Sequence, residues 1–160
     1  MVGGCLNQSV WNYLTNRKWE YGIGDYDIFY WDNDLSESKE NEIKQKVLKM
    51  FSNLKCKFDV VNQARVHKWF SDYFGIEMPG YKSLEHAVSS APSTVTCIVV
   101  TGINGEYKII APNGLGDIFS MTLRYNSQTF IPDKFVIPKI EKWKSKWPEL
   151  KEIRNSHTRA

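Results

Sequence analysis

The sequence has little cysteine and no long apolar run. Its three cysteines, Cys5, Cys56 and Cys97, stand far apart among 160 residues, and none has the spacing of a zinc site. An odd number of separate thiols fits a reducing compartment, so we expect a cytoplasmic protein. No apolar stretch reaches the length of a signal peptide or a membrane span, so we expect no membrane partner.

Internal repeats and low-complexity linkers are also absent. A chain of 160 residues, of which 42% are hydrophobic and 24% charged, suits one domain with a substantial core. Its net charge of +3 is unevenly spread: residues 1–42 hold eight acidic and three basic residues, whereas 134–160 hold eight basic and three acidic ones. Charge alone favours two solvated surfaces of opposite sign; the alternative is an acidic metal end and a basic end that faces phosphates.

Hydrophobic spacing predicts an α/β or α+β domain with a mixed sheet. Strands are expected over 25–31, 57–61, 94–101, 106–111 and 119–125, and helices over 5–15, after position 34, over 62–74, over 83–90 and around 140–147. In the helix over 62–74, Val66, Phe70 and Tyr73 are among the residues expected to be buried. Asn104-Gly105 predicts a type I′ hairpin.

The helix after position 34 has two further expected features. Asp34 resembles its N-cap, because Glu37 follows three residues later as in a capping box. Glu40–Lys44 and Glu42–Lys46 have the i,i+4 spacing of ion pairs on an outer helix surface.

Asp25-x-Asp27, at the start of the strand over 25–31, is the most informative motif. Alternate strand residues point to the same face, so the two carboxylates repel one another unless they are solvated or hold a cation. A solvated strand end is the usual explanation of such a pair. Asp59 stands in a second apolar strand; if the strands are neighbours, three carboxylates converge, as a two-metal site for phosphoryl transfer requires.

Other residues suggest weaker hypotheses. Gly3-Gly4 precedes the first helix, where small residues let backbone N–H groups approach a phosphate, although taken alone these glycines are better explained by a plain tight turn. Asn62 opens the helix after Asp59, and Arg65 has the chemistry to grip phosphate. His67 is more often a packed side chain than a catalyst.

The C-terminal segment interleaves basic and aromatic residues, a pattern that some RNA-binding surfaces show. We favour the alternative, in which the tryptophans pack and the lysines are solvated. The residues concerned are Lys139, Lys142, Trp143, Lys144, Lys146 and Trp147.

Five segments together resemble a mainly bacterial, little-characterised family of the DNA-polymerase-beta-like nucleotidyltransferase superfamily. They are 3–12, 25–32, 59–69, 111–117 and 146–148, and the resemblance runs over nearly the whole chain. It implies a polymerase-beta-like fold, a mixed sheet flanked by helices, in one domain over 1–160. Residues 1–75 would form the metal and nucleotide half, and 76–160 the hairpin and C-terminal helix.

The resemblance also implies a site. Asp25, Asp27 and Asp59 correspond to the catalytic metal ligands, with Mg²⁺ or Mn²⁺ as cofactor and an NTP as substrate. Gly3 and Gly4 correspond to the glycine motif and, with Asn62 and Arg65, are the expected nucleotide-binding residues. The resemblance supplies no acceptor, so RNA, a protein or a small molecule remain open.

Two departures from the superfamily pattern bear on the fold. Twenty residues separate Gly4 from Asp25, a longer interval than usual, and only two residues precede Gly3. The superfamily places a strand before its glycine motif, so we expect that this N-terminal strand is truncated or that the sheet is completed differently. An apolar strand left as an edge templates association, so we expect either a homo-oligomer or a chain that is less stable and less active than one extended upstream.

The leading functional expectation is a metal-dependent enzyme that moves a nucleoside monophosphate from an NTP to an acceptor. The alternative is a catalytically silent nucleotide- or RNA-binding module on the same scaffold.

Overall fold

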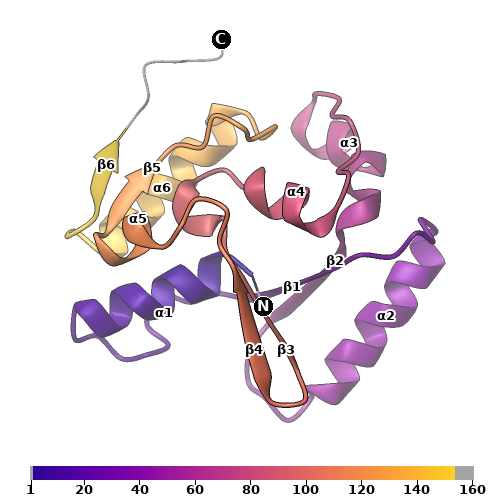
Figure 1. The fold of residues 1–160 in the computed structure, drawn as a ribbon, viewed down its shortest axis with the longest axis horizontal. Helices are drawn as coiled ribbons and strands as arrows, with labels where there is room; N and C mark the ends of the chain where they lie inside the picture. The colour runs from indigo at the N-terminus through magenta and orange to yellow at the C-terminus, as the bar shows by residue number, and fades with distance from the viewer. Residues whose placement is uncertain (1, 154–160) are drawn as a thin grey trace.

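The computed structural model describes residues 2–153, apart from the side chain of Ile103, as a mixed α/β fold. Its elements, with η for 3₁₀ helices, are α1 (Gly4–Leu14), β1 (Tyr26–Tyr30), α2 (Glu37–Met50), β2 (Phe58–Asn62), η1 (Gln63–Lys68), α3 (Phe70–Phe74), α4 (Leu84–Ser89), η2 (Thr94–Thr96), β3 (Val99–Ile103), β4 (Glu106–Ile110), α5 (Gly116–Phe119), β5 (Thr122–Arg124), α6 (Asp133–Lys146) and β6 (Lys151–Ile153). The pairs β1–β2 and β3–β4 lie between α2 and α3 on one side and α1, α5 and α6 on the other (Figure 1). The predicted fold class is confirmed.

The strands form pairs of both kinds. β1 and β2 are parallel, β3 and β4 are antiparallel, and β5 and β6 are parallel. Val2 makes antiparallel bridges to Asp27 of β1 and to Val99 of β3. Within residues 2–153, Val2 therefore links the first two pairs, in the position that the expected N-terminal strand would take.

The hairpin between β3 and β4 has the predicted turn. Asn104 and Gly105 both have positive φ, 54° and 85°, as a type I′ turn requires. The preceding strand starts later than predicted, at Val99, because 94–96 form a 3₁₀ turn instead. The Thr96 hydroxyl donates to the Ser93 carbonyl at 2.7 Å, an example of a local side-chain bond that competes with a strand.

The start of α2 differs from the prediction. Its N-cap is Ser36, whose hydroxyl accepts a hydrogen bond from the Lys39 amide at 3.3 Å. Asp34 accepts from the Ser36 amide at 2.9 Å, so it forms a turn just before the helix. The cap predicted at Asp34 is wrong because the helix begins two residues later.

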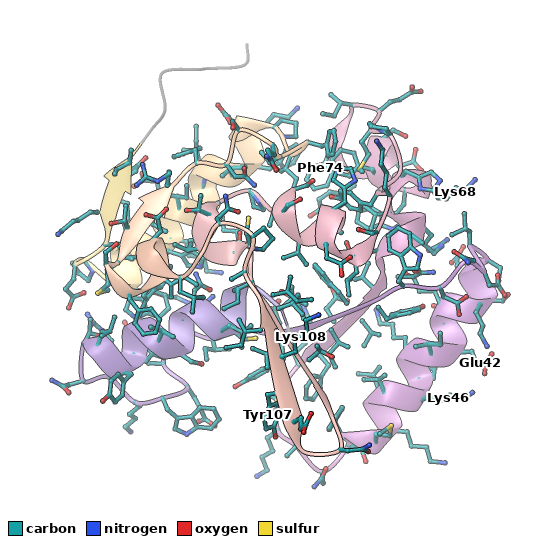
Figure 2. All side chains as sticks on the ribbon, viewed as in Figure 1. Glu42, Lys46, Lys68, Phe74, Tyr107 and Lys108 are labelled. Atoms are coloured by element: carbon teal, nitrogen blue, oxygen red, sulfur yellow. The ribbon has the colours of Figure 1, made fainter. Side chains whose placement is uncertain are left out.

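One of the two predicted ion pairs on α2 is confirmed. Glu42 and Lys46 form an i,i+4 pair that points outward from the helix (Figure 2). The Glu40–Lys44 pair is wrong: Glu40 pairs with Arg65 of η1, and Lys44 lies 3.6 Å from Asp59. The face that carries both residues turns toward β2 and η1, where other partners of opposite charge stand.

The helix predicted over 62–74 is divided into η1 and α3 at Trp69, whose φ is −121°. Val66 and Phe70 are buried as predicted. Tyr73 is 67% exposed, so its predicted burial is wrong. The break changes the helical phase after Trp69 and carries Tyr73 off the buried face.

The strand predicted over 119–125 is largely wrong. Residues 116–119 form α5, Phe119 is exposed, and only 122–124 form β5. Met121, between the two elements, has a φ of 54°, a left-handed conformation that interrupts both helix and strand. β6 has three residues, too few to leave a periodic pattern in the sequence.

Three tryptophans form the centre of the main core. Trp11 of α1 contacts Trp143 and Trp147 edge-on, with ring centroids 5.7 and 5.4 Å apart. The indole of Trp147 donates to Asn12 Oδ1 at 2.9 Å, and Asn12 donates in turn to the carbonyl groups of Trp19 and Tyr21. This network fixes the loop that leads into β1.

Candidate active site

The loop that leads to Asp25 and Asp27 is held in place by α6. Lys146 Nζ donates to the Gly22 carbonyl at 2.8 Å. Gly22 has a φ of 75°, and a Cβ there would lie 2.5 Å from the Trp147 ring. Only glycine fits that position, so the loop passes close over the tryptophan. Asp25, exposed, stands immediately before β1, and Asp27 is half-buried within it.

Asp59 lies directly opposite Asp27. The register of the parallel β1–β2 pair aligns Asp27 with Asp59. Aligned residues of neighbouring strands point to the same face, and Asp25 is two positions before Asp27. The predicted neighbourhood of the two strands is therefore confirmed. The Asp59 side chain is 48% exposed, and Lys44 Nζ approaches it to 3.6 Å.

The opposite face of the same two strands is apolar. Tyr26, Ile28 and Phe58, which alternate with the acidic residues, line a cavity of about 360 Å³. Its other lining residues are Trp19, Glu20, Phe51, Leu54, Lys55 and Cys56. The acidic residues thus have a sheet face of their own, apart from this cavity.

The carboxylates on the acidic face repel one another. The pKa of Asp27 is raised from 3.8 to about 6, first by burial and then by the negative charge of Asp25, with a smaller contribution from Asp59. Lys139 and Lys57 act in the opposite direction. A group of carboxylates that repel one another is stabilised by a cation, and hard oxygen donors suit Mg²⁺ or Mn²⁺.

The three carboxylates do not form a preassembled metal cage. Among residues 2–153, no three His, Cys, Asp or Glu side chains are gathered closely enough to hold a metal ion as they stand. The Lys44–Asp59 contact is one physical reason, because it engages the third carboxylate.

The glycine motif lies beside Asp27. The Val2 amide donates to the Asp27 carbonyl at 3.1 Å, and the Gly3 amide donates to the Ile98 carbonyl at 2.8 Å. Gly3 has φ 50° and ψ −113°, and a Cβ there would lie 3.2 Å from the Thr96 carbonyl oxygen. Burial raises the pKa of the Cys5 thiol, and the negative charge of Asp27 raises it further.

Asn62 and Arg65 have structural partners. Asn62 is 1% exposed; its Oδ1 accepts from the Asp32 amide at 3.1 Å, and its Nδ2 donates to the Asp32 carbonyl at 3.0 Å. Arg65 pairs with Glu40 and donates from Nε to the Leu35 carbonyl at 3.3 Å. Both side chains fix the loop between β1 and α2, and their binding of a nucleotide stays a prediction.

His67 is also a packed residue. Its Nδ1 is buried and has no hydrogen-bond partner in the described part of the chain. A Cβ at Gly80 would lie 3.1 Å from that nitrogen, so the loop at Gly80 closes over the ring.

The C-terminal tryptophans pack as we favoured from the sequence. Trp143 and Trp147 are 5% and 0% exposed, which leaves no ring for base stacking. Lys144 binds Glu152 at 2.7 Å, and Lys146 binds the Gly22 carbonyl. Lys139 remains exposed, and its effect on Asp27 is a feature that sequence spacing did not reveal.

A second polar group, missed by sequence reasoning, supports the fold near α5. Arg124 makes two hydrogen bonds to Asp117, at 3.0 and 3.2 Å, and the Thr94 hydroxyl donates to the same carboxylate at 2.7 Å. The bond to Arg124 is the main cause that lowers the pKa of Asp117. Every oxygen of Asp117 has a partner, so this carboxylate ties η2, α5 and β5 together.

Comparison with known proteins identifies the class. A sequence model of a nucleotidyltransferase family matches residues 1–152, so the chain belongs to that family. A solved NMR structure described as a CCA-adding enzyme head domain has the same fold, with a TM-score of 0.76 and 20% sequence identity. The similarity covers 97% of this chain and 81% of that one. No curated protein sequence matches the chain.

Family membership supports nucleotidyl transfer as the activity class and an NTP as substrate. Over residues 2–153, the structure contains no helix that is both long and apolar enough to cross a membrane.

Proposed function

We propose that this chain is a divalent-metal-dependent enzyme that transfers a nucleoside monophosphate from an NTP to an acceptor. The observation that carries the proposal is the alignment of Asp27 with Asp59 on one sheet face, where Val2, just before the glycine motif, bonds to the Asp27 carbonyl. The raised pKa of Asp27 supports it, because carboxylates that repel one another in the free protein favour a cation.

In this proposal the chain's own residues bind and orient. Asp25, Asp27 and Asp59 hold Mg²⁺ or Mn²⁺, which when bound would offset the negative charge of the phosphates. Gly3 and Gly4 let the backbone at the start of α1 approach the phosphates, since neither carries a side chain in the way. The acceptor's nucleophile forms a bond to the α-phosphorus as the α–β bridging bond breaks, and pyrophosphate leaves. In this proposal Asp59 also takes the acceptor's proton.

A direct test uses each labelled NTP with Mg²⁺ or Mn²⁺ and a cell extract as the source of acceptors. The expected result is a labelled product that requires the metal and is lost when Asp25 and Asp27 are both changed to Asn. A product that forms equally with the double variant would contradict the proposal.

The alternative is a catalytically silent nucleotide- or RNA-binding module. The contact between Lys44 and Asp59 favours it, because it occupies the third carboxylate. This alternative predicts that Mg-NTP raises the melting temperature of both wild type and Lys44→Gln, and that neither protein forms a labelled product. If Lys44→Gln forms a labelled product, Asp59 can instead take part in transfer once its contact with Lys44 is removed. The labelled product would identify the acceptor as RNA, protein or a small molecule. Size-exclusion chromatography would give the oligomeric state.

A further inference from the structure

We propose that β4 is a dimerisation edge, at which the strand pairs antiparallel with β4 of a second copy of this chain, Tyr107 opposite Tyr107. This pairing goes beyond the proposed function and does not depend on it. Val2 bridges both Asp27 and Val99, so β1, the edge expected from the sequence, has a neighbour on each side. The joined strands run in the order β2, β1, Val2, β3, β4, which leaves β4 at one end.

The outer side of β4 is uncovered. Four of its five residues are exposed, and the hairpin extends away from α4 and α5 (Figure 1). Tyr107 and Ile109 are 81% and 55% exposed, high values for large apolar side chains. In the described part of the chain, the backbone of β4 bonds only to β3. An exposed edge strand of this kind templates pairing with another strand.

Tyr107 presents its backbone polar groups at the free edge. The Glu106 carbonyl oxygen lies on the β3 side, 3.2 Å from the position that a Cβ at Gly102 would take. Because a trans peptide directs its N–H opposite to its carbonyl, the Tyr107 amide points away from β3. The direction alternates along an antiparallel strand, so the polar groups of Ile109 point the same way.

The charges of β4 are complementary to those of the same strand running in reverse. Glu106 and Lys108 flank Tyr107 and share the sheet face opposite to its ring. When two copies pair antiparallel about Tyr107, Glu106 of each lies opposite Lys108 of the other, which gives two attractive cross-strand pairs. The next register with the same backbone bonding is centred on Lys108 and would place Lys108 opposite Lys108. Charge therefore selects both the partner and the register.

Both charged side chains can take these partners. Among the described residues, neither Glu106 nor Lys108 forms an ion pair. The pKa of Glu85 on α4 is lowered first by hydrogen bonds from its own amide and from Ser83, and Lys108 adds only a distant charge. Stable dimers bury about 1,200–2,000 Å² in total, more than one pair of short strands provides, so we expect a weak dimer.

The test measures association of the purified chain by analytical ultracentrifugation from about 10 µM to about 1 mM. Wild type should be in equilibrium between monomer and dimer within this range. Glu106→Lys and Lys108→Glu each turn two attractive pairs into two repulsive ones, so each should raise the dissociation constant about tenfold or more. Both positions are exposed, so melting temperatures should be unchanged. Lys18→Glu reverses an exposed charge in the loop after α1 and should associate like wild type.

Two combinations decide whether β4 pairs with itself. The double variant Glu106→Lys/Lys108→Glu restores both attractive pairs, so its dissociation constant should return to within about threefold of wild type. An equimolar mixture of the two single variants should form heterodimers, because each lysine of one chain then faces a glutamate of the other. A surface that met a different patch would not show this mutual rescue.

Three results would overturn the inference: a wild type that stays monomeric up to the highest concentration, a dimer that the single reversals leave unchanged, or single variants that neither combination rescues. The labelled-NTP assay on the single variants is a separate readout. Loss of the dimer with transfer retained, or loss of transfer with the dimer retained, distinguishes this inference from the proposed function.

Discussion

Changing Asp27 to Asn should stabilise the metal-free protein at neutral pH while abolishing transfer. The pKa of Asp27 in the folded chain is about 6, against an ordinary value of 3.8. Folding therefore disfavours the ionised carboxylate, so the contribution of Asp27 to stability is greatest below about pH 4 and is lost as the pH rises from there through 6. The difference corresponds to at most about 3 kcal/mol above pH 7, and solvent screening of this half-buried group reduces it to about 1–3 kcal/mol.

The assay is urea unfolding of wild type and Asp27→Asn without metal, at pH 7.5 and at pH 5. At pH 7.5 the variant should be more stable by about 1–3 kcal/mol, a rise in melting temperature on the order of 2–10 °C. About half of the gain should be lost at pH 5, where Asp27 is largely protonated in the folded protein but still ionised in the unfolded chain. Asp72→Asn, which changes an exposed acid on α3, should shift stability by less than about 0.5 kcal/mol at either pH.

Mg²⁺ provides a second measurement of the same effect. It should raise the melting temperature of wild type at pH 7.5 and less at pH 5, because protons compete for the same carboxylate. A destabilised Asp27→Asn variant at pH 7.5, or a gain of equal size at both pH values, would refute the reasoning.

Three further predictions follow from contacts around the site. Gly3→Ala should cost about 1–3 kcal/mol in urea unfolding, because its backbone conformation is nearly restricted to glycine. Gly114→Ala, also at positive φ but with open space around it, should cost only about 1 kcal/mol. Asn12→Ala breaks three hydrogen bonds that fix the loop before β1, so it should lower the free energy of unfolding by about 2–4 kcal/mol in the same assay. A change below about 0.5 kcal/mol, as expected for a surface site, would contradict the role of Asn12 in fixing the loop. Arg65→Ala should destabilise the protein by about 2–4 kcal/mol, because it leaves Glu40 without its partner. Below the melting temperature of the variant, calorimetry should still give wild-type affinity for Mg-NTP. A selective loss of that affinity would show that Arg65 binds the nucleotide.

Local backbone chemistry explains what was predictable from the sequence. The two-residue period of a strand places Asp25 and Asp27 on one side whatever the rest of the fold does. Asn104-Gly105 predicted its hairpin turn because both residues tolerate positive φ. The helix at 4–14 and the strands at 26–30 and 58–62 follow from the spacing and type of their own apolar residues.

Failures of prediction occurred where a local pattern has two outcomes of similar energy. Period-two spacing over 119–125 matched a strand, but Met121 at positive φ divides that segment between α5 and β5. The Thr96 hydroxyl donates to the Ser93 carbonyl and accepts from the Ser93 amide, so a β-forming composition gave a 3₁₀ turn over 94–96.

Tertiary structure alone decided which charges meet. Glu40 has suitable spacing to Lys44, yet it pairs with Arg65, and Lys44 turns to Asp59. Sequence spacing sets the direction of a side chain relative to its own backbone, whereas its partner depends on which distant element packs there. The alignment of Asp27 with Asp59 required the parallel register of β1 and β2. The packing of α6 against the loop before β1 joins segments that lie far apart in the sequence, because Trp147 and Lys146 both contact Gly22.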